Sequence, residues 1–169
     1  MSEAIGQRVQ ILPIAAEHIE GFHQCLDAVA RERRYLGMVE APPLESVRDS
    51  DLAHIKAGIP RFVALLDGEV IGWCDVFPHK LEGFRHRGEL GMGVYARYRH
   101  MGIGERLARR TLQAAKELGL ERIDLEVYAS NVPAIKLYEK LGFAVEGVKK
   151  RGRKLDGQYD DIVDMVLFI

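Results

Sequence analysis

The stretch Arg99-His100-Met101-Gly102-Ile103-Gly104 decides how this chain is expected to fold. It comes after Glu89 to Val94, a segment with the length of a strand, and it opens a stripe of apolar residues at helical spacing that runs to Leu118. The glycines therefore mark a turn between a strand and a helix. Because the first N–H groups of a helix have no intrahelical partner and lie at the positive end of its dipole, such a turn suits a phosphate group.

The two glycines have two interpretations at this stage. Side chains at positions 102 and 104 would keep an anion away from the free N–H groups, which gives glycine a functional reason there. Glycine also makes a tight strand-to-helix corner in proteins that bind nothing at that place. The chain has no G-x-x-x-x-G-K-[ST] and no G-x-G-x-x-G after a first strand, so the common nucleotide-binding motifs do not apply.

Strands and helices alternate on both sides of this turn, which predicts a layered fold. Toward the N-terminus the pattern predicts strands at 9–12, 62–66 and 70–74, helices at 17–33 and 47–56, and a loop at 37–46. Toward the C-terminus it predicts strands at 123–128, 143–148 and 162–168, and a helix from Asn131 to Leu141. Asp67-Gly68 and Asp156-Gly157 are typical turn pairs, and the basic stretch Lys149–Lys154 is expected in a loop.

Length and composition indicate one domain over residues 1–169, because 169 residues with 47% hydrophobic content suffice for one core. Lys and Arg number 24 and Asp and Glu 25, so the formal charge of -1 favours neither nucleic acid nor a membrane surface as partner. No apolar run approaches the roughly 20 residues of a membrane span, and a cytoplasmic location is expected. Cys25 and Cys74 are expected as separate core thiols.

Two motifs together carry a resemblance to a known family. Arg99-x-x-Gly102-x-Gly104 resembles the coenzyme A signature of the GNAT superfamily, and the segment from Leu125 through Asn131 and Ala134 to Phe143 is similar to the superfamily's second cofactor-side motif. The resemblance covers about residues 61–169, with the coenzyme motifs within 88–143. It is nearest to bacterial acetyltransferases of ribosomal-protein N-termini and of phosphinothricin-like small amines.

The resemblance implies an α/β (α+β) fold, in which a mixed, mostly antiparallel sheet of about seven strands is flanked by about four helices. Strands four and five should splay apart at a bulge, for which Gly91 and Gly93 are suited. The implied activity is transfer of an acetyl group from acetyl-CoA to a primary amine by direct attack in a ternary complex, with a small amine, an amino acid or a protein N-terminus as acceptor. The alternative is a non-catalytic acyl-CoA sensor or interaction domain. Relatives often form a homodimer.

The residues implied to hold the coenzyme lie at the end of the fourth strand, in the glycine turn and in the second motif. The strand backbone should pair with the pantetheine arm, an N–H near Val94 should stabilise the oxyanion, and the turn should hold the pyrophosphate. These residues are Met92, Gly93, Val94, Arg99, His100, Met101, Gly102, Ile103, Gly104, Glu105, Asn131, Ala134 and Tyr138.

Three residues are implied in proton transfer. Tyr138 matches the family tyrosine that faces the coenzyme sulfur and would protonate the leaving thiolate, although a tyrosine there can also be a core-edge aromatic. Glu89 matches the base of the phosphinothricin-like enzymes, and Glu126 matches that of the ribosomal alanine enzymes. We favour Glu89, while either glutamate can be a solvated strand residue. Acceptor choice is expected to depend on residues 34–56.

Other clusters suggest no metal site. The six histidines have no H-E-x-x-H spacing, and Asp160, Asp161 and Asp164 are expected to face solvent or to pair with the basic stretch 149–154. That stretch is open to two uses. It can contact the coenzyme phosphates or an acidic acceptor, or it can be a solvated hairpin.

Overall fold

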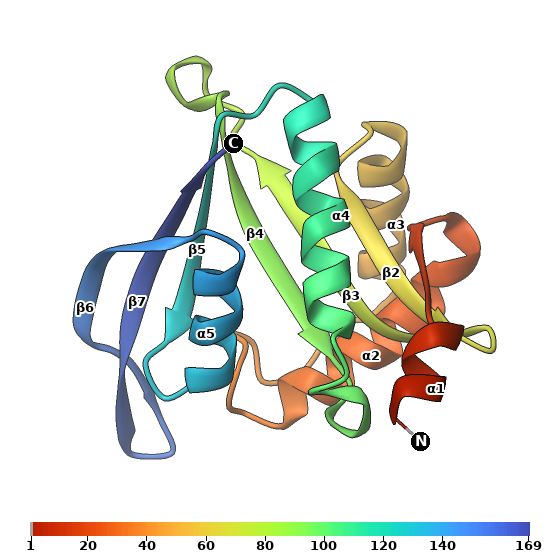
Figure 1. Ribbon diagram of the computed structural model, residues 1–169, viewed down its shortest axis with the longest axis horizontal. Coiled ribbons are helices and arrows are strands. Elements are labelled where there is room, and N and C mark those ends of the chain that lie inside the picture. The colour runs from red at the N-terminus through yellow and green to blue at the C-terminus, as the bar shows by residue number, and fades with distance from the viewer. Residues whose placement is uncertain (1) are drawn as a thin grey trace.

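The computed structural model describes residues 2–169, with side chains described from Ile5 onward. Its centre is a seven-stranded sheet of order β1-β2-β3-β4-β5-β7-β6 (Figure 1). The strands are β1 (Gln10–Pro13), β2 (Arg61–Leu66), β3 (Glu69–Pro78), β4 (Arg87–Val94), β5 (Arg122–Tyr128), β6 (Ala144–Leu155) and β7 (Gln158–Phe168). The α-helices are α1 (Ser2–Arg8), α2 (Ile19–Arg31), α3 (Leu44–Lys56), α4 (Ile103–Glu117) and α5 (Val132–Lys140). Short 3-10 helices span Ala16–His18, Glu82–Phe84 and Ala96–Tyr98.

The splay between β4 and β5 is confirmed. These two strands are parallel and pair only over residues 87–89 and 122–124, whereas every other neighbouring pair in the sheet is antiparallel. Figure 1 shows β4 and β5 diverging from this short contact. The resulting gap leaves backbone groups of both strands without a strand partner, and such groups need another partner when they are buried.

Helices cover both faces of the sheet, as the predicted layered fold requires. Helices α4 and α5 lie on one face, where the apolar stripe of α4 packs on Ile71, Val76 and Ile123. Helices α2 and α3 lie on the other face, over Val63 and Trp73 (Figure 1). The two cores therefore lie on opposite faces of β2 and β3. Cys25 and Cys74 are free and buried, as predicted.

Several boundaries differ from the prediction. Helix α1 was not expected, and α3 begins at Leu44 rather than Val47 because Pro43, with its fixed φ, stands directly before the first turn. The basic stretch 149–154 lies in β6 and not in a loop. The register of β6 with β7 shifts between Lys149 and Arg153. This irregularity explains why the segment pairs as a strand although its sequence lacks the alternation of apolar and polar residues typical of strands.

The predicted bulge at Gly91 and Gly93 is wrong. From Gly72 with Val94 to Pro78 with Gly88, β3 and β4 pair without a register shift. A Cβ atom at Gly93 would lie 2.2 Å from the ring of Trp73, and one at Gly91 would lie 3.1 Å from Oδ1 of Asp75. Glycine is needed at both positions because the side chains of Trp73 and Asp75 on β3 lean over β4. Strands β4 and β5 diverge without a bulge in the β3–β4 pairing.

A buried charge cluster ties α3 to the sheet beneath this region. Arg61 on β2 donates to Asp51 on α3 at 2.5 Å, and its Nε lies 3.5 Å from Asp75 on β3. The guanidinium also stacks 4.1 Å above the ring of Phe22. Burial raises the pKa of Asp75 to about 7, although Arg61 acts in the opposite direction.

Candidate active site

The glycine turn has the geometry that anion binding requires. His100 and Gly102 both have positive φ, 61° and 74°, and α4 begins immediately afterward at Ile103. The first intrahelical hydrogen bond of α4 is made by the N–H of Arg106, which donates to the Gly102 carbonyl at 3.1 Å. The N–H groups of Ile103, Gly104 and Glu105 therefore precede the first intrahelical bond and can donate to a ligand.

Gly104 stands where the turn faces α5 and β4. A Cβ atom there would lie 3.0 Å from the terminal methyl group of Met92 and 3.4 Å from Leu137. Gly104 has a negative φ in this helix, so the reason for glycine is space rather than backbone conformation. A larger residue would project toward the gap between the splayed strands.

The backbone of β4 offers hydrogen-bonding groups to that gap. The bonds from Tyr95 N–H to Ile71 O and from His79 N–H to Arg87 O set the phase of the β3–β4 ladder. In an antiparallel ladder alternate residues face the partner strand, so the polar groups of Gly93 face β3 while those of Met92 and Val94 face the gap. No strand pairs with Met92 or Val94 on that side within residues 2–169.

Arg99, the first residue of the signature, is held by protein groups. Its two terminal nitrogens donate to the carboxylate of Glu32 at 2.8 and 2.5 Å, and its Nε donates to the Val94 carbonyl at 2.9 Å. The guanidinium also lies 4.6 Å from the ring centre of Tyr35. Arg99 therefore joins the end of α2 to the end of β4 and fixes the start of the turn.

The second motif builds the opposite wall. Asn131 caps α5, its side chain accepting from the N–H of Ala134 at 3.3 Å, as the sequence predicts. On this helix Tyr138 points into the core, is only 8% exposed, and meets Phe143 edge to face at 5.7 Å. Burial, with a smaller contribution from Cys74, raises the pKa of the Tyr138 hydroxyl, which is therefore protonated at neutral pH.

These elements enclose a cavity of about 640 Å³ between α4, α5 and the splayed strands. It is lined by every residue predicted to hold the coenzyme except Met101, which packs against the core instead. Tyr35 and Leu36, which follow α2 and fall within the range 34–56 expected to affect acceptor choice, also line it. The sequence analysis gave no role to Lys136 and Lys140 on α5, which also line it and could have been found from their spacing of four, since this places them on one face of the helix.

The two candidate bases occupy different positions. Glu126 on β5 lines the large cavity together with Tyr138, and it also lines a second cavity of about 340 Å³. Glu89 lines only the second cavity. Lys149 bonds to Glu126 and, at 2.9 Å, to Asp164, so the basic stretch reaches this second cavity. The predicted pairing of the acidic cluster with the basic stretch is thus confirmed for Asp164, and Asp161 pairs with Lys150 at 2.8 Å.

Comparison of this chain with known proteins assigns it to a family. Residues 23–143 match the acetyltransferase (GNAT) family. The chain belongs to the GNAT acetyltransferase family. An L-amino acid N-acetyltransferase of Escherichia coli is 31% identical over 134 residues, which are 78% of this chain and 82% of that protein. The spermidine N(1)-acetyltransferase of Escherichia coli is 31% identical over 164 residues, 95% of this chain and 86% of that protein.

Solved GNAT structures share the fold. An acetyltransferase from Salmonella typhimurium, solved with acetyl-CoA, superposes with a TM-score of 0.89 at 18% identity, over 95% of this chain and 94% of that one. The residues of this chain fit acetyl-CoA, because the turn presents free N–H groups and the gap presents free strand backbone.

Among residues 2–169, no group of His, Cys, Asp or Glu is arranged to hold a metal ion, and no helix is long and apolar enough to cross a membrane.

Proposed function

We propose that this GNAT chain transfers the acetyl group of acetyl-CoA directly to a primary amine within a ternary complex. The observation that carries the proposal is the continuity of one cavity. It runs from the free N–H groups at the start of α4, past the free backbone of Met92 and the free N–H of Val94, to Tyr138. A phosphate-bearing thioester needs those three features in that order, because its anionic end, its amide-containing arm and its sulfur follow one another.

Each part of the chain has one task in this proposal. The N–H groups of Ile103 to Glu105 hold the pyrophosphate. Met92 pairs with the amides of the pantetheine arm, and the N–H of Val94, whose carbonyl accepts from Arg99, stabilises the oxyanion that forms on attack. Gly93, whose polar groups face β3, makes room for the ring of Trp73. Arg99 keeps the turn in place through Glu32 and Val94.

Tyr138 is the proposed general acid. Burial raises the pKa of its hydroxyl, so the proton stays on Tyr138 at neutral pH and is available to the coenzyme sulfur as the C–S bond breaks. Tyr138 lines the same cavity as the free backbone of β4, which is the position this role requires.

Glu126 is the carboxylate that we place first as the base, in contrast to the preference for Glu89 from sequence. An attacking amine must reach the cavity that contains Tyr138, and Glu126 lines that cavity whereas Glu89 does not. Glu126 bonds to Lys149, which would have to release it or share it during proton uptake. Glu89 is the second candidate and would act through water from the neighbouring cavity.

The acceptor is proposed to be a small amine, an amino acid or a protein N-terminus. Relatives named for L-amino acids and for spermidine support the first two classes. An N-alpha-acetyltransferase of Sulfurisphaera tokodaii, 40% identical over 93 residues that are 48% of this chain and 54% of that protein, supports the third. All three classes present a primary amine, and attack by the neutral form is the chemistry they share.

The deciding experiment is a turnover screen with acetyl-CoA and a panel of L-amino acids, polyamines, aminoglycosides and N-terminal peptides. Release of the free coenzyme thiol is followed, and each product is checked by mass. We expect transfer to at least one amine and loss of that transfer in Tyr138→Phe. Tight binding of acetyl-CoA without transfer to any amine of the panel would instead favour the non-catalytic acyl-CoA sensor.

A further inference from the structure

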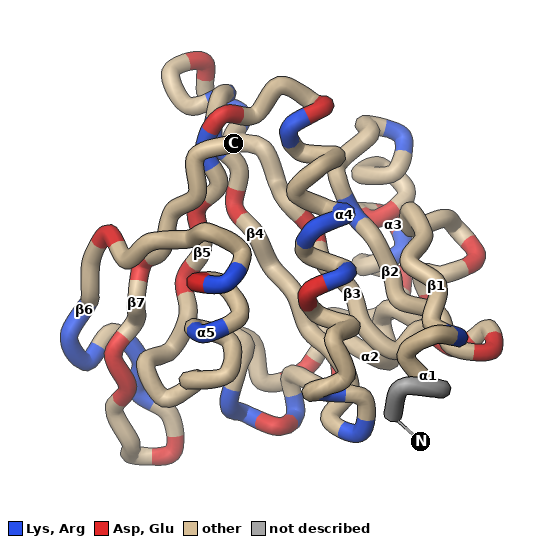
Figure 2. The backbone as a smooth tube through the Cα atoms, viewed as in Figure 1, with Lys and Arg blue, Asp and Glu red and all other residues tan. Residues whose placement is uncertain are grey.

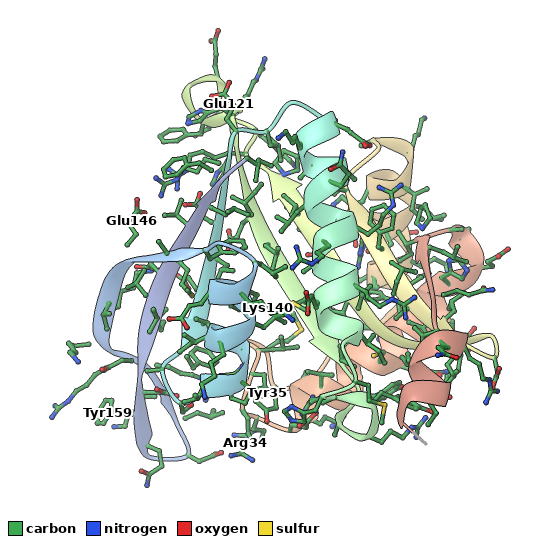
Figure 3. The ribbon with its side chains drawn as sticks, viewed as in Figure 1. Arg34, Tyr35, Glu121, Lys140, Glu146 and Tyr159 are labelled. Carbon is green, nitrogen blue, oxygen red and sulfur yellow. The ribbon has the colours of Figure 1, made fainter. Side chains whose placement is uncertain are left out.

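An ion pair joins α4 and α5, two helices that both carry charged residues beside the large cavity (Figure 2). Nζ of Lys140, in the last turn of α5, lies 2.6 Å from Oε2 of Glu105, in the first turn of α4. Both residues line the cavity. Figure 3 labels Lys140 between the two helices. These helices stand on opposite sides of the gap, so this contact joins the two walls beside the free N–H groups at the start of α4.

Glu105 has a second cation of its own. Arg109, one turn later on α4, donates to Oε1 of Glu105 at 3.0 and 2.9 Å. The hydrogen bond from Lys140, followed by that from Arg109, lowers the pKa of the Glu105 carboxyl, so it is ionised at neutral pH. A carboxylate in the first turn of a helix is the same kind of anion that the free N–H groups there attract from solution.

We propose that Lys140 is a phosphate-binding residue for the coenzyme and that Glu105 is its counterion in the unliganded protein. This inference rests on the proposed function, since it assumes that acetyl-CoA enters this cavity. When a phosphate binds at the start of α4, Lys140 exchanges the carboxylate for the phosphate. Glu105 stays neutralised by Arg109, so the exchange leaves no charge without a partner.

The exposure of the three side chains permits that exchange. Those of Lys140 and Arg109 are 63% and 57% exposed, whereas that of Glu105 is 23% exposed. An exposed lysine pair contributes little to stability, so breaking it costs little. The pyrophosphate as a whole, and likewise the 3′-phosphate, carries more negative charge than one carboxylate and therefore attracts the ammonium more strongly. Lys136, one turn earlier on α5, lines the same cavity and can add a second positive charge.

The test measures binding of three donors by calorimetry: acetyl-CoA, acetyl-dephospho-CoA, which lacks the 3′-phosphate, and acetyl-pantetheine, which has no phosphate. We expect Lys140→Gln to weaken acetyl-CoA binding about tenfold, the scale of one charge-assisted hydrogen bond, and to leave acetyl-pantetheine binding unchanged. Lys140→Arg should restore most of the affinity. Glu105→Gln should bind acetyl-CoA as tightly as the wild type or more tightly, because the competing carboxylate is gone.

Lys116→Gln is the matched control, since Lys116 is an exposed lysine in the last turn of α4 and does not line the cavity. Loss of dephospho-CoA affinity in Lys140→Gln would assign the contact to the pyrophosphate, and retention would assign it to the 3′-phosphate. Unchanged acetyl-CoA binding in Lys140→Gln, or equal loss for acetyl-pantetheine, would overturn the inference alone. A wild-type protein that binds none of the three donors would overturn the proposed function itself.

Discussion

The guanidinium of Arg99 donates to both carboxylate oxygens of Glu32, at 2.8 and 2.5 Å. This pair joins residues 67 positions apart, the end of α2 and the turn before α4. A motif comparison alone would make Arg99 a direct ligand of the coenzyme. The geometry instead gives its side chain to the protein, where it holds the turn that presents the N–H groups.

Glu32→Gln is therefore predicted to weaken acetyl-CoA binding, although Glu32 belongs to neither coenzyme motif. The partly buried Arg99 would lose its counterion, the turn would be held less firmly, and the dissociation constant should rise about three- to tenfold. Calorimetry measures this change, with the exposed Glu20→Gln on the same helix as control. If Arg99→Gln weakens binding and Glu32→Gln does not, Arg99 acts on the coenzyme directly.

Gly104→Val is predicted to abolish coenzyme binding while the protein stays folded. The new side chain would meet Met92 and Leu137 and would project over the free N–H groups. Because Gly104 lies beside a cavity rather than in the core, the loss of stability should stay within about 1–2 kcal/mol. Calorimetry with acetyl-CoA reports binding and thermal unfolding reports the fold. Unchanged affinity would remove the turn from the site.

The sequence predicted those parts of the fold that local chemistry determines. The glycine turn, the Asn131 cap and the Asp67-Gly68 and Asp156-Gly157 turns depend on backbone preferences of a few adjacent residues, and all four are where they were expected. The apolar stripe of α4 likewise determined which face is buried.

What the sequence could not predict depends on contacts between distant segments. The reason for Gly93 is the ring of Trp73 on the neighbouring strand, and no local pattern records that contact. Three further features arise only once the sheet is assembled. They are the charge cluster of Arg61, Asp51 and Asp75, the ion pair of Arg99 with Glu32, and the different cavities that Glu89 and Glu126 line. The basic stretch 149–154 looked like a loop because its charges hide the strand alternation.

Asp75 is predicted to make stability depend on pH. Its pKa is raised by burial from 3.8 to about 7, so the folded state favours the protonated form. The stabilisation is therefore complete below about pH 4 and is lost as pH rises through about 7. Relative to Asp75→Asn, which stays neutral, the wild type should lose unfolding free energy over this range. The loss should be about 1.4 kcal/mol for each pKa unit between the folded and unfolded states.

Urea unfolding of both proteins at several pH values measures this difference. Arg61 and Asp51 are present in both but interact with Asp75, so the difference reports the coupled charge cluster as a whole. A difference between the two proteins that does not change between pH 4 and 8 would show that Asp75 is ionised in the folded state throughout, held by Arg61.

Asp156→Asn is predicted to change the acceptor's KM and not that of acetyl-CoA. Asp156, at the β6–β7 turn, accepts from Arg33 at 3.0 and 2.7 Å, and so ties the hairpin to the segment that continues into Tyr35 and Leu36 at the cavity. Loosening this tie should raise the acceptor's KM severalfold. Asp67→Asn is the matched control, because Asp67 is also in an Asp-Gly turn, is equally exposed at 64%, and pairs with Arg8 away from the cavity. Equal effects of both substitutions would contradict a role in acceptor binding.

The last prediction separates the acid from the base. Tyr138→Phe keeps the ring against Phe143 but removes the hydroxyl, so kcat should fall about 100-fold, the usual scale for a positioned acid, with coenzyme affinity nearly unchanged. Glu126→Gln should lower kcat/KM by a similar factor and move its pH profile upward, because the amine must then lose its proton to solvent. Glu89→Gln, on the second cavity alone, should be nearly normal. The reverse pattern of the two glutamines would move the base to β4 and make water the carrier of the proton. If both glutamine variants are active and only Tyr138→Phe is impaired, the neutral amine comes directly from solution and no protein base takes part.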